Sequence, residues 1–237
     1  MKQSLDWDAL AGLFPEFQEP GRWLPLLQRH AQLLEGAAPR VRASSVPAAE
    51  AVRRHYAESL EVMRLAPGGD GEGPLADVGS GGGFPGMVMA AVAPGCVVHL
   101  VEPLGKRAHL LEEMAAALGL ANVRVHRQRA EEAGRGPLRD ACALVIARAV
   151  APLRELLEYT APLAAPGGAV VLPKGSALEA ELAGSGGAQA ALGCWFVAAA
   201  AMRADVSGTI SVAVFRKEGP TPEAYPRAPG RPRKRPL

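Results

Sequence analysis

A carboxylate followed by a run of glycines is the most chemically specific feature of the chain. Asp77 follows the apolar residues Leu75 and Ala76, and Gly79-Ser80-Gly81-Gly82-Gly83 comes directly after Val78. Glycine tolerates positive φ and lets a ligand approach the backbone closely, and a helix that begins after such a turn offers free N–H groups. The pattern predicts a strand, a turn and a helix that together bind a nucleotide-like cofactor.

The position of Asp77 indicates the charge of that cofactor. Gly81, Gly83 and Gly86 fit the dinucleotide spacing, and Glu102 at the end of the next predicted strand could bind a ribose hydroxyl. The carboxylate of Asp77 would repel a pyrophosphate, whereas it would attract the sulfonium and ammonium groups of S-adenosylmethionine. We therefore expect S-adenosylmethionine as the cofactor, with NAD and an oxidoreductase activity as the alternative.

The elements that must position these residues alternate between strand and helix from residue 75 onward. Strands are predicted over residues 75–79, 97–102, 123–127, 143–147 and 169–172, and helices over 85–92, 104–118, 152–163 and 177–192. Such alternation is typical of an α/β, Rossmann-like fold with a mostly parallel sheet. Two further apolar segments, 195–202 and 209–216, have the spacing of an antiparallel hairpin, which brings the sheet to seven strands.

The regions on either side of this alternating part have a different composition. Apolar residues recur at helical spacing from Trp23 to Leu34 and again from Val52 to Met63, while residues 67–74 read as a linker. Six prolines between positions 220 and 236 predict an extended tail without a regular helix. We therefore divide the chain into an N-terminal helical extension (1–66), a cofactor-binding domain (67–217) and a basic tail (218–237).

Composition indicates the class of protein and of partner. Hydrophobic residues make up 49% of the 237 residues, which is typical of a globular protein. No apolar run approaches the roughly 18 residues of a membrane span, and the three cysteines are far apart, so we expect reduced thiols, no metal site and a cytoplasmic protein. From residue 216 to the end the net charge is +5, against −3 for the rest, which favours either a nucleic-acid partner or a solubilising tail.

The chain resembles the class I S-adenosylmethionine-dependent methyltransferases, and more closely the RsmG (GidB) family, which methylates N7 of a guanine in 16S rRNA (guanine 527 in the family). The resemblance runs from about residue 20 to the end. It rests on the glycine turn with Phe84-Pro85-Gly86 and on a set of later motifs. In order, these are Leu104-Gly105-Lys106-Arg107, Arg129-Ala130-Glu131-Glu132, Arg148-Ala149-Val150-Ala151-Pro152-Leu153, Lys174-Gly175 and Thr221-Pro222 with Tyr225-Pro226-Arg227.

The resemblance implies a set of cofactor contacts. By position these are Gly79, Phe84, Ala130, Glu131 and Arg148, and the resemblance also matches Asp77, Gly81 and Gly83 to the first motif and Glu102 to the ribose-binding acid. It implies 16S rRNA, or a precursor of the small ribosomal subunit, as the partner. We expect a monomer that binds neither a membrane nor a metal. An RNA-binding module without catalysis is the alternative from a different class.

Methylation of guanine N7 makes few chemical demands on the protein. N7 carries a lone pair and no proton, so the reaction needs orientation and not a general base, and we assign no catalytic residue. Basic side chains and a histidine are the candidates for binding the RNA: His55, Lys106, Arg148, Lys174, Arg227 and Arg233. For His55 packing against the sheet is an equal alternative, and Lys106 could simply be solvated. The sequence departs from the family pattern at residues 41–45, at Glu58 and at Ala228.

Overall fold

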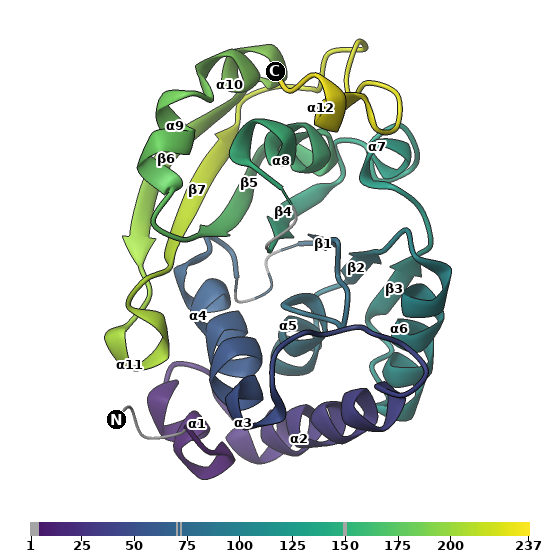
Figure 1. Cartoon of the computed structure of the whole chain (residues 1–237), viewed down its shortest axis with the longest axis vertical. Helices are drawn as coiled ribbons and strands as arrows, with labels where there is room; N and C mark the ends of the chain where they lie inside the picture. Colours follow the sequence, from purple (N-terminus) through teal and green to yellow (C-terminus); the bar gives the residue numbers. More distant parts are fainter. Residues whose placement is uncertain (1–4, 70, 72, 149–150) are drawn as a thin grey trace.

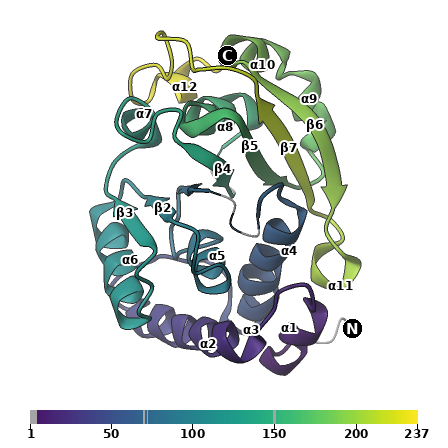
Figure 2. The same cartoon turned by 180° about the vertical axis from the view of Figure 1, so that it is seen from behind.

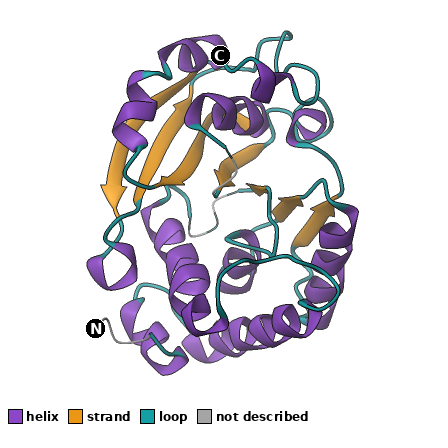
Figure 3. Ribbon diagram, viewed as in Figure 1, coloured by secondary structure: helices purple, strands orange, loops and turns teal. Residues whose placement is uncertain are grey.

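The computed structural model contains one seven-stranded sheet in the order β3-β2-β1-β4-β5-β7-β6 (Figure 1, Figure 3). The structure describes residues 5–69, 71, 73–148 and 151–237. The strands are β1 (Leu75–Val78), β2 (Val98–Val101), β3 (Val123–His126), β4 (Cys142–Ala147), β5 (Ala164–Lys174), β6 (Cys194–Ala201) and β7 (Ser211–Lys217). Strands β1 to β5 pair in parallel, and β7 pairs antiparallel with both β5 and β6. The predicted α/β class, the seven strands and the antiparallel end are therefore confirmed.

Helices cover both faces of the sheet. They are α1 (Trp7–Leu13), α2 (Pro20–Ala37), α3 (Ala48–Ala51), α4 (Glu58–Leu65), α5 (Gly86–Val92), α6 (Gly105–Ala117), α7 (Ala130–Ala133), α8 (Leu153–Thr160), α9 (Leu178–Ala183), α10 (Gly186–Leu192), α11 (Ala204–Ser207) and α12 (Arg231–Lys234). A π-helical segment, η1 (Val52–Ala57), joins α3 to α4, and a short 3₁₀ turn, η2 (Ala161–Leu163), follows α8. In the part of the chain that is described, no helix combines the length and apolar character needed to cross a membrane.

Three predicted elements differ from the structure in detail. The expected helix over 177–192 is two helices, because α9 ends at Gly184 and α10 begins after Ser185. The helix expected over 152–163 ends at Thr160, and β5 then begins earlier than expected, at Ala164. The predicted antiparallel hairpin is present, since β6 pairs with β7, but its connection contains the short helix α11.

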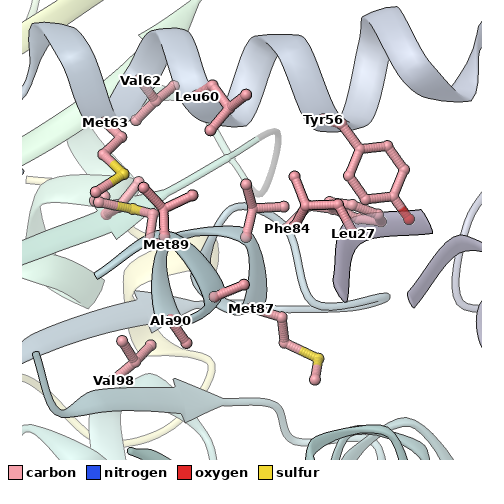
Figure 4. Packing of buried hydrophobic residues seen from close by; sticks show 14 of the residues in the cluster. Leu27, Tyr56, Leu60, Val62, Met63, Phe84, Met87, Met89, Ala90 and Val98 are labelled. Atoms are coloured by element: carbon pink, nitrogen blue, oxygen red, sulfur yellow. The ribbon is translucent and has the colours of Figure 1, made fainter. Parts of the chain in front are cut away.

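The side chains of the sheet alternate between two apolar cores, as the pleat requires. On one face, residues such as Leu100 and Ile146 pack with the N-terminal helices and α5, while on the other Val101 and Val145 pack with α8 and α10. Figure 4 shows this core, with Leu60 and Met63 on the same side as Tyr56 and with Met87, Met89 and Ala90 of α5 below them. The N-terminal helices thus share a core with the sheet. The domain boundaries at 66 and 217 stay predictions.

The C-terminal tail packs on the body of the molecule, which corrects the prediction of an extended surface segment. The buried Nζ of Lys217 donates to Asp140 Oδ1 (2.9 Å) and Thr221 Oγ1 (2.8 Å), and Arg139 donates to the carbonyl of Thr221 (2.6 Å). Residues Arg231–Lys234 form a helical turn next to α8, seen in Figures 1 and 2. Pro232 permits this turn because the first turn of a helix needs no N–H donor.

The three cysteines have the surroundings that the sequence predicts. Cys96, Cys142 and Cys194 are free thiols and all three are buried, as expected. Burial raises the pKa of both Cys142 and Cys194 to about 12. Asp70 and Glu72 of the linker, and Ala149 and Val150 of the motif after β4, lie outside the described residues. Across the described ranges no group of three or more His, Cys, Asp or Glu side chains could hold a metal ion.

Candidate functional site

Two adjoining cavities open at the carboxyl ends of the parallel strands. The first cavity, about 960 Å³, is lined by the residues that follow β1, β2, β3 and β4. The second cavity, about 750 Å³, lies between the glycine turn, residues 43–58 and the end of β5. Gly79, Arg107 and Arg148 line both. Strand β1 has β2 on one side and β4 on the other, so the cavities lie at the point where strand order reverses, the usual ligand site of such sheets.

The glycine turn has the backbone conformation that its residues allow. Gly79, Gly81 and Gly83 have φ values of 76°, 55° and 93°, a region that other residues rarely adopt. A Cβ on Gly83 would also lie 2.7 Å from Met87 Sδ. Gly81 N donates to Glu102 Oε2 at 3.0 Å, which ties the turn to the end of β2. The turn is thus held rigidly between the two cavities.

Asp77 lies beneath this turn and is fully buried. Its Oδ2 accepts a hydrogen bond from Gly86 N at 2.9 Å, whereas its Oδ1 has no hydrogen-bond partner among the residues that the structure describes. Burial raises the pKa of Asp77 to about 6, against the opposing effects of the Gly86 N–H and of Arg148. Asp77 is not among the described residues that line either cavity. Asp77 is therefore separated from both cavities by the glycine turn.

Glu102, which the sequence predicts to bind a ribose hydroxyl, lines the first cavity. Only 2% of the residue is exposed, and its two oxygens accept from Leu104 N (2.9 Å) and from Gly81 N (3.0 Å). A carboxylate has about four acceptor positions, so each oxygen can accept one more hydrogen bond. The acid at the cavity wall, the glycine turn and the unpartnered Oδ1 of Asp77 fit a cationic nucleoside such as S-adenosylmethionine.

The tail reaches the far wall of the first cavity. Ala130 and Glu131 both line this cavity, and the buried Glu131 accepts a hydrogen bond from Gly230 N at 2.8 Å. Arg233, which the sequence assigns to RNA, also lines the first cavity. The structure thus brings a predicted RNA-binding residue next to the predicted cofactor residues.

Arg148 lies where the two cavities meet. Its Nη1 donates to the carbonyl of Arg54 (2.8 Å) and is 3.4 Å from Glu58 Oε2, while its Nη2 is 3.0 Å from His55 Nδ1. Burial and the adjacent guanidinium lower the pKa of His55 to about 3, so the imidazole is neutral at pH 7. Burial raises the pKa of Glu58, although Arg148 opposes this.

His55 and Phe84 both belong to the second cavity. The sequence assigns Phe84 to the cofactor, but the ring borders the second cavity and is not among the described residues that line the first. The guanidinium carbon of Arg148 is 5.6 Å from the centroid of this ring. Arg148, His55 and Phe84 therefore form one wall that connects the two cavities.

Three predicted RNA-binding residues have different surroundings from those expected. Lys106 is exposed and outside both cavities, whereas its neighbour Arg107 lines both and donates to the carbonyl of Arg42 from Nε (3.1 Å) and Nη2 (2.9 Å). Lys174 lines the second cavity, but its Nζ donates to Glu181 Oε2 at 2.7 Å. Arg227 lies outside both cavities and pairs with the buried Glu158, Nε to Oε1 at 2.8 Å, so its guanidinium is used inside the molecule.

Sequence reasoning missed two residues of this site, Arg107 and Ser44. Arg107 is one position from the predicted Lys106, and a helical step of one residue rotates a side chain onto another face. Ser44 lines the second cavity within residues 41–45, where the sequence departs from the family pattern and offers no motif. Its hydroxyl oxygen is 2.7 Å from His55 Nε2. The face of α6 on which Arg107 lies is known only from the structure. The same holds for the contact of Ser44 with His55.

Comparison with known proteins agrees with this geometry. Residues 25–195 match the family model described as GidB, rRNA small subunit methyltransferase G. A "Ribosomal RNA small subunit methyltransferase G" from Roseiflexus castenholzii is 41% identical over 189 residues, which cover 79% of this chain and 80% of that protein. A protein of the same name from Pelotomaculum thermopropionicum is 39% identical over 190 residues, with 79% of each chain covered.

Solved structures share the fold at much lower identity. A protein from Corynebacterium glutamicum superposes with a TM-score of 0.53 and 17% identity over 90% of this chain and 97% of that one. A 16S rRNA (adenine(1408)-N(1))-methyltransferase from Catenulisporales acidiphilia superposes with a TM-score of 0.52 and 18% identity, covering 70% of this chain and 92% of the other. Together with the family model and the close relatives, the fold and the paired cavities establish that this chain belongs to the rRNA small subunit methyltransferase G (GidB) family.

Proposed function

We propose that this S-adenosylmethionine-dependent rRNA methyltransferase transfers a methyl group to N7 of a guanine in 16S rRNA. The observation that carries the proposal is the junction of the two cavities, where Gly79 and Arg148 line both. A cofactor in the first cavity and a base in the second would then meet over the glycine turn. Methyl transfer depends mainly on holding the methyl donor and the acceptor atom close together and in line.

The first cavity is the proposed cofactor site. The turn at Gly79, Gly81 and Gly83 would approach the cofactor through backbone atoms, Glu102 would accept hydrogen bonds from the ribose, and Ala130 with Glu131 would border the adenine. When bound, the cofactor supplies a methyl group on an electrophilic sulfonium. The buried carboxylate of Asp77 would stabilise this cation through the turn, and it would disfavour a pyrophosphate, so NAD is the weaker candidate.

The second cavity is the proposed acceptor site. Its lining includes five basic side chains and two acidic ones, in the order of the chain Glu50, Arg53, Arg54, Glu58, Arg107, Arg148 and Lys174. A basic cavity attracts the phosphates of RNA and makes its binding depend on salt. Guanine N7 has no proton to remove, so the residues here orient the base and are not required to act as a general base.

The similarity to rRNA methyltransferases also supports a proposal for the RNA substrate and for the place where the enzyme acts. We extend the proposal to 16S rRNA or a precursor of the small ribosomal subunit, methylated by a monomer in the cytoplasm. The exposed basic residues Arg231, Lys234 and Arg235 of α12 and its C-terminal end would contact the RNA backbone. Arg227 does not enter this proposal, because its guanidinium pairs with Glu158.

The test supplies 16S rRNA, free and in 30S particles, together with S-adenosylmethionine labelled in the methyl group. Label is expected on N7 of one guanine, and mapping of the modified base identifies it. Label on another atom, or none in either substrate, would contradict the proposal. RNA binding without transfer would favour the non-catalytic binding module. Thermal stabilisation by S-adenosylhomocysteine but not by NAD distinguishes the two cofactors.

A further inference from the structure

The polar contacts of the second cavity fix the direction of every hydrogen bond around Ser44. The chain of contacts begins at Arg148, whose guanidinium is a donor only. Its Nη2 is 3.0 Å from His55 Nδ1, so Nδ1 must accept. The imidazole is neutral, and its proton therefore resides on Nε2.

Within the described part of the chain, the Nε2–H of His55 has one partner, the hydroxyl oxygen of Ser44 at 2.7 Å. The same oxygen accepts a second hydrogen bond from Val46 N at 3.0 Å. A serine hydroxyl has two acceptor positions and one donor, so both acceptor positions of Ser44 are occupied. Its O–H group remains as a donor, and among the described residues this donor has no acceptor.

Ser44 lines the second cavity and is half-buried, so its remaining donor is available to a ligand there. The six-position of a purine distinguishes guanine from adenine, because guanine has the acceptor O6 and adenine has the donor N6–H₂. A hydroxyl that can only donate is complementary to O6 of guanine and not to the N6–H₂ group of adenine. A contact to O6 also leaves the neighbouring N7 lone pair free for the methyl group.

We propose that the second cavity contains a subsite for the six-position of a 6-oxopurine, in which the hydroxyl of Ser44 donates to O6 of the target guanine. The subsite rests on the proposed function, since it places the acceptor base in this cavity. Arg148 and His55 act on it as positioning residues, because they fix the polarity of Ser44. A rigid imidazole between Arg148 and Ser44 would also polarise the hydroxyl, as successive hydrogen bonds strengthen one another.

The experiment measures kcat/KM for RNA that carries guanine, 2-aminopurine (no six-position substituent) or 2,6-diaminopurine (a six-amino donor) at the target. The wild-type enzyme is expected to prefer guanine over 2-aminopurine by about tenfold, the effect of one hydrogen bond. It should discriminate more strongly against 2,6-diaminopurine, which leaves the hydroxyl facing a donor. In Ser44→Ala the preference for guanine over 2-aminopurine should fall close to one.

Two control variants keep the test specific. Ser44→Thr retains the hydroxyl and should restore the preference, whereas Ser176→Ala, at an exposed serine that is not among the described residues lining either cavity, should not change it. Urea unfolding of each variant separates a loss of folding from a loss of selectivity. An Ala variant that keeps the wild-type preference would overturn the subsite. Absence of N7 methylation by the wild-type enzyme would instead overturn the proposed function, so the two failures are distinguishable.

Discussion

The imidazole of His55 lies flat on the ring of Phe84, with the ring centroids 4.1 Å apart and the planes inclined by 7°. His55 belongs to η1, and Phe84 follows directly after the glycine turn. The same phenyl ring meets His30 and Tyr56 edge to face, at 5.1 Å and 5.2 Å. A single ring thus joins the N-terminal helices to the turn between the two cavities, so a shift of the turn would also move His55.

Replacing Phe84 tests this connection. Phe84→Leu keeps an apolar side chain but removes the ring that supports His55. It should lower the free energy of unfolding by about 1–2 kcal/mol and raise KM for the RNA more than the Kd for S-adenosylhomocysteine, because Phe84 borders the second cavity. Urea unfolding, calorimetry and steady-state kinetics measure these effects.

The matched control is Phe196→Leu, the same change at a residue that is 38% exposed on the edge strand β6. It should leave KM for the RNA unchanged. An equal loss of cofactor and RNA binding in Phe84→Leu would show that the ring supports both cavities alike, contrary to our assignment.

Cofactor binding should weaken in mild acid because of Asp77. Burial raises the pKa of this carboxyl from 3.8 to about 6, so in the free protein it is charged above pH 6 and neutral below. Ionisation of this buried carboxyl opposes folding. The protonated carboxyl therefore makes a favourable contribution to the free energy of unfolding that is fully present below pH 3.8 and is lost as the pH rises through 6. A bound cation favours the ionised form and lowers the pKa, so affinity should fall as the pH falls through 6.

Isothermal titration calorimetry between pH 7.5 and 5 measures this effect. Affinity for S-adenosylmethionine should drop by up to about tenfold at pH 5, the limit for one group that titrates near 6. Asp77→Asn should bind more weakly at pH 7.5 and lose most of the dependence on pH. If the variant kept the full pH dependence, another group would be responsible and Asp77 would not sense the cofactor charge.

Local spacing was sufficient to predict that the glycine turn and Glu102 lie together. Asp77, the glycines and Glu102 occur at strand ends within 26 residues of one another in the sequence, and the parallel sheet aligns those ends. Periodicity also predicted the strands, because buried parallel strands are short continuous apolar runs. The antiparallel end followed from the same elements, whereas the order of the strands comes from the structure.

The position of the tail and the rest of the site depend on contacts between residues far apart in the chain. Arg227 pairs with Glu158 and Gly230 with Glu131, and no pattern in the tail indicates either partner. Prolines predicted an extended tail, whereas the structure has turns and the short helix α12 in this segment. The prolines also carry no information on what the tail packs against. Lys106 and Arg107 are equally basic in sequence, and only the rotation of α6 decides which one reaches the cavities.

The pairing of Arg227 with Glu158 predicts a structural and not an RNA-binding role for this arginine. Arg227→Ala would leave a carboxylate that is 0% exposed without its partner, at a cost of about 3 kcal/mol in the free energy of unfolding. The double variant Arg227→Met with Glu158→Leu removes both charges and should recover most of this loss. Urea unfolding of the single and double variants provides the measurement.

RNA affinity of the double variant decides between the two roles. It should equal that of the wild type, whereas a loss of affinity in the stable, folded double variant would restore Arg227 as an RNA contact. Arg231→Ala is the comparison at an exposed position, with an expected change in stability within 0.5 kcal/mol.

Removal of residues 230–237 should weaken cofactor binding, although the tail is the most basic part of the chain. Truncation deletes the Gly230 N–H that holds Glu131 and the side chain of Arg233 at the wall of the first cavity. We expect the Kd for S-adenosylhomocysteine to rise several-fold, since one hydrogen bond to a carboxylate is worth about 1.5–3 kcal/mol at most. Arg233→Ala should show part of this effect.

Arg235→Ala is the matched variant, because Arg235 is exposed and is not among the described residues that line the first cavity. It should leave cofactor affinity unchanged and reduce the slope of log affinity for RNA against log salt by about 0.7, the contribution of one phosphate contact on a single strand. Equal cofactor affinity in the truncated and full-length proteins would mean that Glu131 needs no support from the tail. The tail would then serve the RNA alone, and the Gly230–Glu131 contact would be incidental to the chemistry of the first cavity.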